Sequence, residues 1–183
     1  MEEEAVTLAR VGEDPAAAAV LVRRHQAVMT RFVSRMLGAD DPGVDDVVQK
    51  AFIAAFAHPQ RYDGRSSVRT WLLGIVHNTA RMTLRSRVRR RQVVELFGAV
   101  QSLWPRSAAP EVEAQELGDR LRAALDTLDP DRRAVFLLTE AEGFTAAEVA
   151  EIVGAPAGTV RRWRVEARDR LRPLLADLRE VVP

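Results

Sequence analysis

The sequence predicts an all-α protein with two small helical domains, the second of which contains a helix-turn-helix. Apolar residues recur three or four positions apart along most of the chain, which is the spacing of one helix face. No stretch shows the alternation that is typical of a strand. The helical pattern stops over residues 98–110, where glycine, proline and serine interrupt it. We therefore place the domains at residues 14–93 and 111–177, joined by a flexible linker at residues 94–110.

Three helices are predicted in the first domain. The first spans residues 15–37, with Asp14 as N-cap and Pro15 in the first turn. The second spans residues 44–59, and the third runs from residue 68 past residue 85. The third helix is expected to bury Val68, Trp71, Leu72, Ile75, Thr79 and Met82.

The second domain is predicted to hold four shorter helices, at about residues 111–128, 130–142, 145–153 and 157–172. The last two fit a helix-turn-helix. Gly154 lies at the turn, where a positive φ is needed, and Thr145 with Glu148 is expected to form a capping box. The expected inward positions of the motif are Val149, Val153, Ala155, Val160 and Trp163. The alternative is an ordinary helical hairpin with a solvated basic face.

Composition narrows the functional class. The 183 residues include no cysteine and three histidines, so disulfides and thiolate metal sites are excluded. No run of about 20 uncharged apolar residues could cross a membrane. The chain opens with three glutamates rather than a signal peptide. We expect a cytoplasmic protein with no metal and no cofactor. We find no pattern of catalytic residues, so we expect no enzymatic activity.

Charge is distributed unevenly although the net charge is only +1. Residues 14–93 hold 14 basic and 6 acidic residues, residues 94–160 hold 5 and 12, and residues 161–183 hold 7 and 4. Two basic zones on either side of an acidic one indicate two contacts with a polyanion, or two solvated helix faces.

The first basic zone is concentrated at residues 61–91, which hold nine arginines and one acid. Tyr62, Trp71 and Asn78 lie among the arginines. This combination favours single-stranded nucleic acid, because bases stack on aromatic rings and phosphates bind arginine. Taken singly, Trp71 is interpreted as a core residue and His77 as a surface or capping residue. Asp45, Asp46 and Gln49 give the second helix a polar face that suits a basic protein partner better than DNA, or that is an ordinary solvated face.

Together these stretches resemble the extracytoplasmic-function group of bacterial RNA polymerase sigma factors. The matching segments are VDDVVQKAFIAAF, RYDGRSSVRTWLLGIVHNTARMTLR and LDTLDPDRRAVFLLTEAEGFTAAEVAEIVGAPAGTVRRWRVEARDRLR. They follow one another in the order and spacing of the family. The resemblance implies two helical domains, no catalytic residues, and three partners: core RNA polymerase, promoter DNA (double-stranded and melted) and an anti-sigma factor.

The resemblance also implies roles for individual residues. The loop and third helix would read the minus-ten element and capture a flipped base, through Tyr62, Asp63, Gly64, Arg65, Ser66, Ser67, Asn78, Arg81 and Arg85. The last helix would read the minus-thirty-five element in the major groove, through Thr159, Arg161, Arg162, Val165, Glu166 and Arg168. The second helix would dock on the β′ clamp helices of the polymerase, through Asp45, Asp46, Gln49 and Lys50. The second domain would meet the β flap.

The sequence departs from the family pattern at a few of these positions. Lys50 occupies a position where the family usually has an acidic residue. Glu166 occupies a position where a basic residue is frequent. Glu166 either accepts a hydrogen bond from cytosine or pairs with a neighbouring arginine. Trp163 is expected to replace an aliphatic core residue. The alternative function is a helix-turn-helix regulator that binds operators without polymerase, which leaves the basic loop and third helix unexplained. A pure interaction scaffold would not bind DNA in a salt-dependent way.

Overall fold

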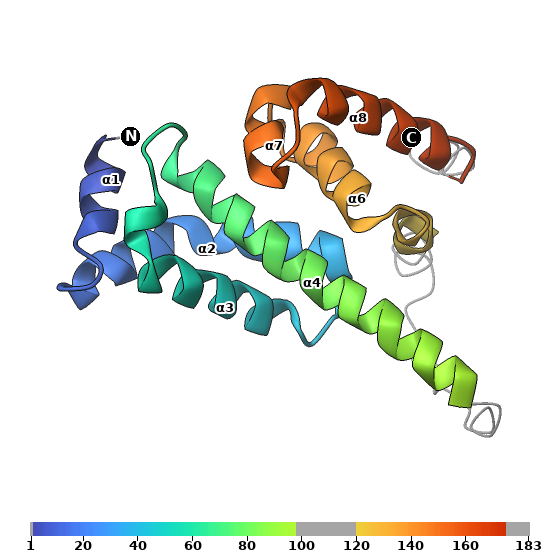
Figure 1. Ribbon diagram of the computed structural model, residues 1–183, viewed down its shortest axis with the longest axis horizontal. Coiled ribbons are helices and arrows are strands. Elements are labelled where there is room, and N and C mark those ends of the chain that lie inside the picture. The colour runs from blue at the N-terminus through green and yellow to red at the C-terminus, as the bar shows by residue number, and fades with distance from the viewer. Residues whose placement is uncertain (1, 98–119, 175–183) are drawn as a thin grey trace, which may run out of the picture.

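The computed structural model describes residues 2–97 and 120–174, which are helical throughout apart from short connections (Figure 1). The described part contains no strand. The all-α class predicted from the sequence is therefore confirmed. The predicted linker lies largely outside the described residues. Its first four residues, 94–97, are still helical, because α4 continues to Phe97.

The N-terminal half is built on three long helices, α2 (Pro15–Leu37), α3 (Val44–Ala57) and α4 (Val68–Phe97). Helix α2 begins as predicted: the Asp14 side chain accepts the N–H of Ala16 at 2.9 Å, and Pro15 opens the first turn. The three helices pack against one another around fully buried side chains. The largest of these are Leu21, Met29, Phe32, Met36, Leu72 and Leu73.

A short N-terminal helix, α1 (Glu2–Ala9), was not predicted from the sequence. It packs on α2 and on the single turn η1 (Pro59–Arg61). Leu8 is 1% exposed, and Glu4 Oε1 lies 2.8 Å from Arg24 Nε. The first half therefore begins before residue 14, the predicted boundary.

The C-terminal half contains helical residues 120–126, α6 (Pro130–Phe136), the wide turn η2 (Leu137–Ala141), α7 (Ala146–Val153) and α8 (Ala157–Leu171). The capping box of α7 is present, because Thr145 and Glu148 exchange hydrogen bonds. Gly154 ends α7 with φ of 69°, a left-handed conformation that costs glycine little. The helix-turn-helix expected from the sequence is confirmed.

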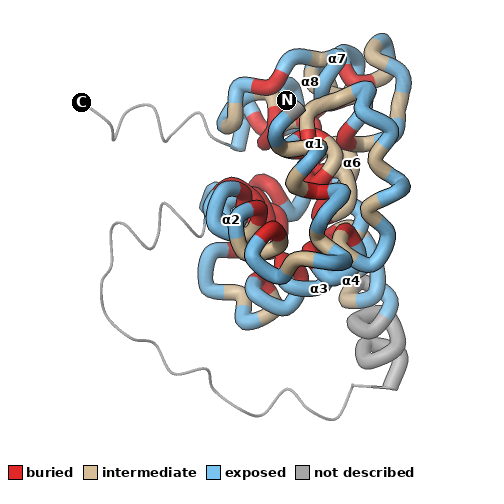
Figure 2. Tube along the Cα trace, turned by 90° about the vertical axis from the view of Figure 1, so that its left-hand side faces the viewer, coloured by how far each residue is buried: buried red, intermediate tan, exposed pale blue. Residues whose placement is uncertain are grey.

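The two halves are packed together, which the sequence did not indicate. Helices α6 and α7 pack against α4, and buried residues from both halves form one continuous core (Figures 1 and 2). At the crossing of α4 and α7, a Cβ on Gly74 would lie 3.4 Å from the carbonyl oxygen of Ile152. Glycine at this position lets the two backbones approach closely.

Two predictions about α4 are wrong. Met82 is 70% exposed, because the buried face of α4 passes instead through Leu73, Val76 and Ala80. His77 is fully buried rather than at the surface. It faces the second half of the chain, so a helical pattern taken over one domain could not place it. Trp71, expected in the core, is half-buried and packs against its edge.

Candidate nucleic-acid interface

The loop that precedes α4 is held in shape by its own polar groups. The Tyr62 hydroxyl donates to the carbonyl of Ser66 at 2.6 Å, and its ring meets Trp71 edge to face with centroids 5.6 Å apart. Asp63 accepts the N–H of Arg65 at 3.1 Å across a turn in which Gly64 has φ of 76°. Asp63, Gly64 and Arg65 are exposed at the tip of the loop.

Ser67 serves as the cap of α4. Its hydroxyl accepts the N–H of Thr70 at 3.0 Å, and its carbonyl accepts the N–H of Trp71. Ser67 therefore fixes the direction in which the loop enters the helix. Ser66 beside it is half-buried.

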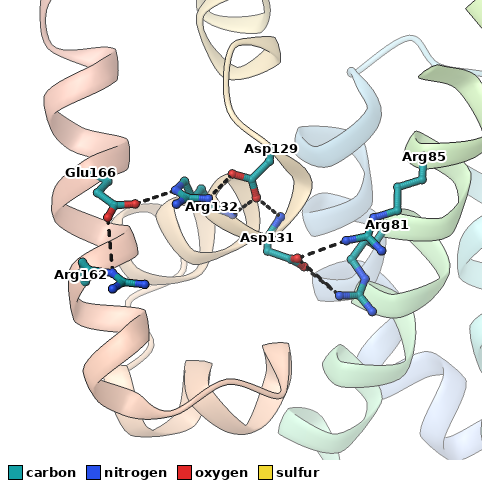
Figure 3. A network of polar contacts seen from close by, with 7 residues as sticks. All are labelled: Arg81, Arg85, Asp129, Asp131, Arg132, Arg162 and Glu166. Carbon is teal, nitrogen blue, oxygen red and sulfur yellow. Dashed lines mark hydrogen bonds and ion pairs between the residues drawn. The ribbon is translucent and has the colours of Figure 1, made fainter. Parts of the chain in front are cut away.

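The other three residues predicted to read the minus-ten element lie along α4. Asn78 is exposed. Arg81 and Arg85 point toward Asp131 of α6 (Figure 3), at 3.2 and 3.6 Å. We call the loop residues 62–67 together with these three side chains the minus-ten surface.

The predicted docking residues form an exposed face of α3. Lys50 Nζ lies 2.6 Å from Asp46 Oδ2, one helical turn away. Lys50 therefore offsets the charge of Asp46, whereas Asp45 and Gln49 border a groove between α2 and α3. This docking groove is lined by Val22, Gln26, Thr30, Asp45, Val48, Gln49, Phe52, Ile53 and Phe56. Ile53 is 59% exposed, so the groove has an apolar rim that a protein helix can cover.

Helix α8 carries the residues predicted to read the minus-thirty-five element. Thr159 lies in its first turn and is half-buried, while Arg161, Arg162 and Val165 are exposed. Trp163 packs at the edge of the core as expected, with the Arg132 guanidinium 5.7 Å from its ring centroid.

Acidic side chains hold several arginines of α8 in place. Glu166 Oε2 accepts from Arg132 at 2.7 Å, and Arg162 Nε lies 3.4 Å from its other oxygen (Figure 3). Glu140 accepts from Arg164 at 2.7 Å and Arg168 at 3.2 Å, and hydrogen bonding from Arg164 lowers the pKa of its carboxyl. Glu166 thus pairs with two arginines in this structure, and its contact with cytosine stays a prediction.

In the described ranges, no cluster of histidine and carboxylate side chains could hold a metal ion. Within the same ranges, no helix is both long and apolar enough to span a bilayer.

Comparison with known proteins assigns the family. Residues 21–90 match the family described as sigma-70 region 2, and residues 118–171 match sigma-70, region 4. The chain is 32% identical over 172 residues to the ECF RNA polymerase sigma-E factor of Escherichia coli K12, which covers 85% of this chain and 87% of that protein. The chain belongs to the extracytoplasmic-function sigma factors. It is also 29% identical to the RNA polymerase sigma factor CarQ of Myxococcus xanthus over 158 residues, or 86% and 88% of the two chains.

Two solved structures have a similar fold. The structure of CnrH in complex with the cytosolic domain of CnrY matches with a TM-score of 0.69 and 26% identity, over 95% of this chain and 97% of that one. The sigma factor RpoE of Bartonella quintana, in complex with the anti-sigma factor NepR, matches with a TM-score of 0.64 and 24% identity, over 86% and 96%. By its membership of this family, the chain is a regulatory DNA-binding protein of transcription.

Proposed function

We propose that this sigma factor docks on core RNA polymerase and directs initiation at promoters that it reads at two separate elements. One observation carries the proposal: the chain has two different basic surfaces. One is a helix-turn-helix with exposed arginines, and the other is the minus-ten surface, a basic loop and helix that include the aromatic ring of Tyr62. A protein that only bound duplex operators would need the first surface and not the second.

The minus-ten surface suits an opened strand. Arginines can hold phosphates while a base leaves the stack, and an aromatic contact of about 1–3 kcal/mol per base offsets part of the cost of unpairing. We assign Tyr62 and Asn78 to the captured base, Arg65, Arg81 and Arg85 to the strand, and Asp63, Gly64, Ser66 and Ser67 to the shape of the loop.

The exposed arginines of α8 suit the major groove. In a helix-turn-helix, the first turns of the second helix reach base edges. We assign base or phosphate contacts to Thr159, Arg161, Arg162 and Val165. Glu166 pairs with Arg132 of α6 and Arg168 pairs with Glu140 of η2, so we assign these two residues to positioning α8 against its neighbours.

The docking groove suits a helical protein partner. We assign its contact to the β′ clamp helices, with Asp45, Asp46, Gln49 and Lys50 at the polar edge, and we assign the second half to the β flap. Because the similar structure of the sigma factor RpoE holds the anti-sigma factor NepR, and that of CnrH holds the cytosolic domain of CnrY, we also propose an anti-sigma partner here. The polymerase performs the chemistry, so we assign no catalytic role to this chain and place it in the cytoplasm.

Run-off transcription tests the proposal. Core polymerase with the purified chain should yield promoter-specific transcripts from genomic DNA, and core polymerase alone should not. A chain that leaves start sites unchanged would contradict the proposal. A tight footprint on DNA without polymerase would favour the stand-alone regulator instead.

A further inference from the structure

One carboxylate of the second half occupies the cationic face of α4. Oδ1 of Asp131 lies 3.2 Å from Nη1 of Arg81 and 3.3 Å from Nε2 of His77, and Oδ2 lies 3.6 Å from Nη2 of Arg85 (Figure 3 shows the two arginines). His77 is fully buried, and the side chain of Asp131 is 18% exposed. Three nitrogen-bearing side chains on successive turns of one helix therefore converge on a single anion.

This contact is one part of a wider interface between the halves. Glu142 of the second half pairs with Arg31 at 3.2 Å and Arg35 at 2.6 Å on α2. The backbones of α4 and α7 meet at Gly74. In this packing, α8 lies on the outer side of the second half, away from α4 (Figure 1), and its early arginines are exposed.

We propose that His77, Arg81 and Arg85 form one anion site, for which Asp131 and a phosphate of the opened promoter strand compete. The inference rests on the proposed function, because it uses the same arginines. Carboxylates and phosphates both accept charge-assisted hydrogen bonds from guanidinium groups. A site filled by Asp131 cannot also hold a phosphate, so closure of the two halves and capture of the minus-ten strand exclude each other.

The competition predicts opposite behaviour at the two DNA elements. When the two halves are packed together, α8 stays accessible to the minus-thirty-five duplex. Arg81 and Arg85, which would hold the opened strand, are blocked by Asp131. Binding to core polymerase would separate the halves and release the anion site only where the promoter is to be opened. The chain therefore needs no additional protein to reduce its own affinity for single strands.

The first test replaces Asp131 with asparagine, which keeps the size of the side chain and removes its charge. The full-length Asp131→Asn chain should bind a fluorescent single-stranded minus-ten oligonucleotide about fivefold more tightly than wild type. It should bind a minus-thirty-five duplex with unchanged affinity. The control is Asp40→Asn, an exposed loop residue, which makes the same change in net charge and should alter neither affinity.

A second test opens the interface without touching the anion site. Gly74→Leu places a side chain against the Ile152 carbonyl and should also tighten binding of the single strand. Because the chain has no cysteine, dyes can be attached at Ala54→Cys and Glu151→Cys, both exposed. Energy transfer between the dyes should fall in Gly74→Leu and in Asp131→Asn, and stay unchanged in Asp40→Asn.

The outcomes separate this inference from the proposed function. If both variants bind the single strand like wild type while wild type still directs promoter-specific transcription, the competition is wrong and the function stands. A double variant tests whether the two anions share a site. If Asp131→Asn still tightens binding of the single strand when Arg81 is replaced by alanine, the Asp131 carboxylate and the strand phosphate do not compete for that site. Failure of wild type with core polymerase would overturn the function itself.

Discussion

Asp41 shows how a single carboxylate connects two helices of the first half. Its Oδ1 accepts two hydrogen bonds. One comes from the N–H of Gly43, just before α3, at 2.8 Å, and the other comes from Nη2 of Arg87 on α4, also at 2.8 Å. The side chain is 7% exposed. Hydrogen bonding from Arg87 lowers the pKa of the Asp41 carboxyl although burial raises it. The two residues are 46 positions apart, so no sequence pattern could have paired them.

This pair predicts a pH-dependent stability. The pKa of Asp41 is lower in the folded chain than in the unfolded chain, where it is about 3.9. The stabilisation that the Asp41 carboxylate gives the folded state is therefore complete above the unfolded-chain pKa. It is lost as the pH falls through the lower, folded-state pKa. Urea unfolding at pH 7 should show Asp41→Asn less stable than wild type by about 1–3 kcal/mol. The difference should shrink below pH 4. The matched variant Asp40→Asn should show neither effect.

Arg161 gives a residue-scale prediction for DNA reading. It is exposed on the early part of α8, where side chains reach base edges. Arg161→Ala in the polymerase complex should weaken binding of a minus-thirty-five duplex by about 1–3 kcal/mol. Arg170→Ala, exposed near the end of the same helix, is the control. Equal losses in footprint titrations would remove Arg161 from the reading surface.

Helix boundaries were the most predictable feature of this chain. Asp14 with Pro15 marked the start of α2, and Thr145 with Glu148 marked the start of α7, because caps and first-turn residues act locally. Helix α1 was missed because it is short and packs through few side chains, Leu8 foremost. Met82 was misplaced because the buried face of α4 turns toward a different neighbour along its length.

Two glycines of the helix-turn-helix give a prediction at the scale of the element. Gly154 has φ of 69°, whereas Gly158 lies within α8 without a positive φ and with open space around its Cβ position. Gly154→Ala should destabilise the protein by about 1 kcal/mol, since alanine is strained in the left-handed region. Gly158→Ala should stabilise it by about 0.5–1 kcal/mol through helix propensity. Urea midpoints that shift in the same direction would contradict this account of the turn.

At the scale of the whole molecule, the sequence predicted two domains but not their contact. Besides buried apolar residues, the contact is made by arginines, carboxylates and a glycine, which a sequence pattern assigns to solvated faces and turns. His77, Asp131 and Arg133 could not be interpreted from one domain alone, because each has a polar partner in the other half. The roles assigned to single residues by resemblance stay predictions, and the ion pairs of Arg81 and Arg85 with Asp131 were not predictable from the sequence.

Arg133 carries the last prediction, that the halves unfold as one unit. It is 5% exposed, and it donates to the Met36 carbonyl near the end of α2 at 2.7 Å and to Asp126 at 2.7 Å. Arg133→Ala would leave that buried carbonyl unpaired, at a cost of about 1–3 kcal/mol concentrated at the interface. Wild type should give one calorimetric transition whose calorimetric and van't Hoff enthalpies agree. Arg133→Ala should split the transition in two, because each half then melts separately, while Arg170→Ala should keep the single transition. Two transitions already present in wild type would show that the shared core does not couple the halves.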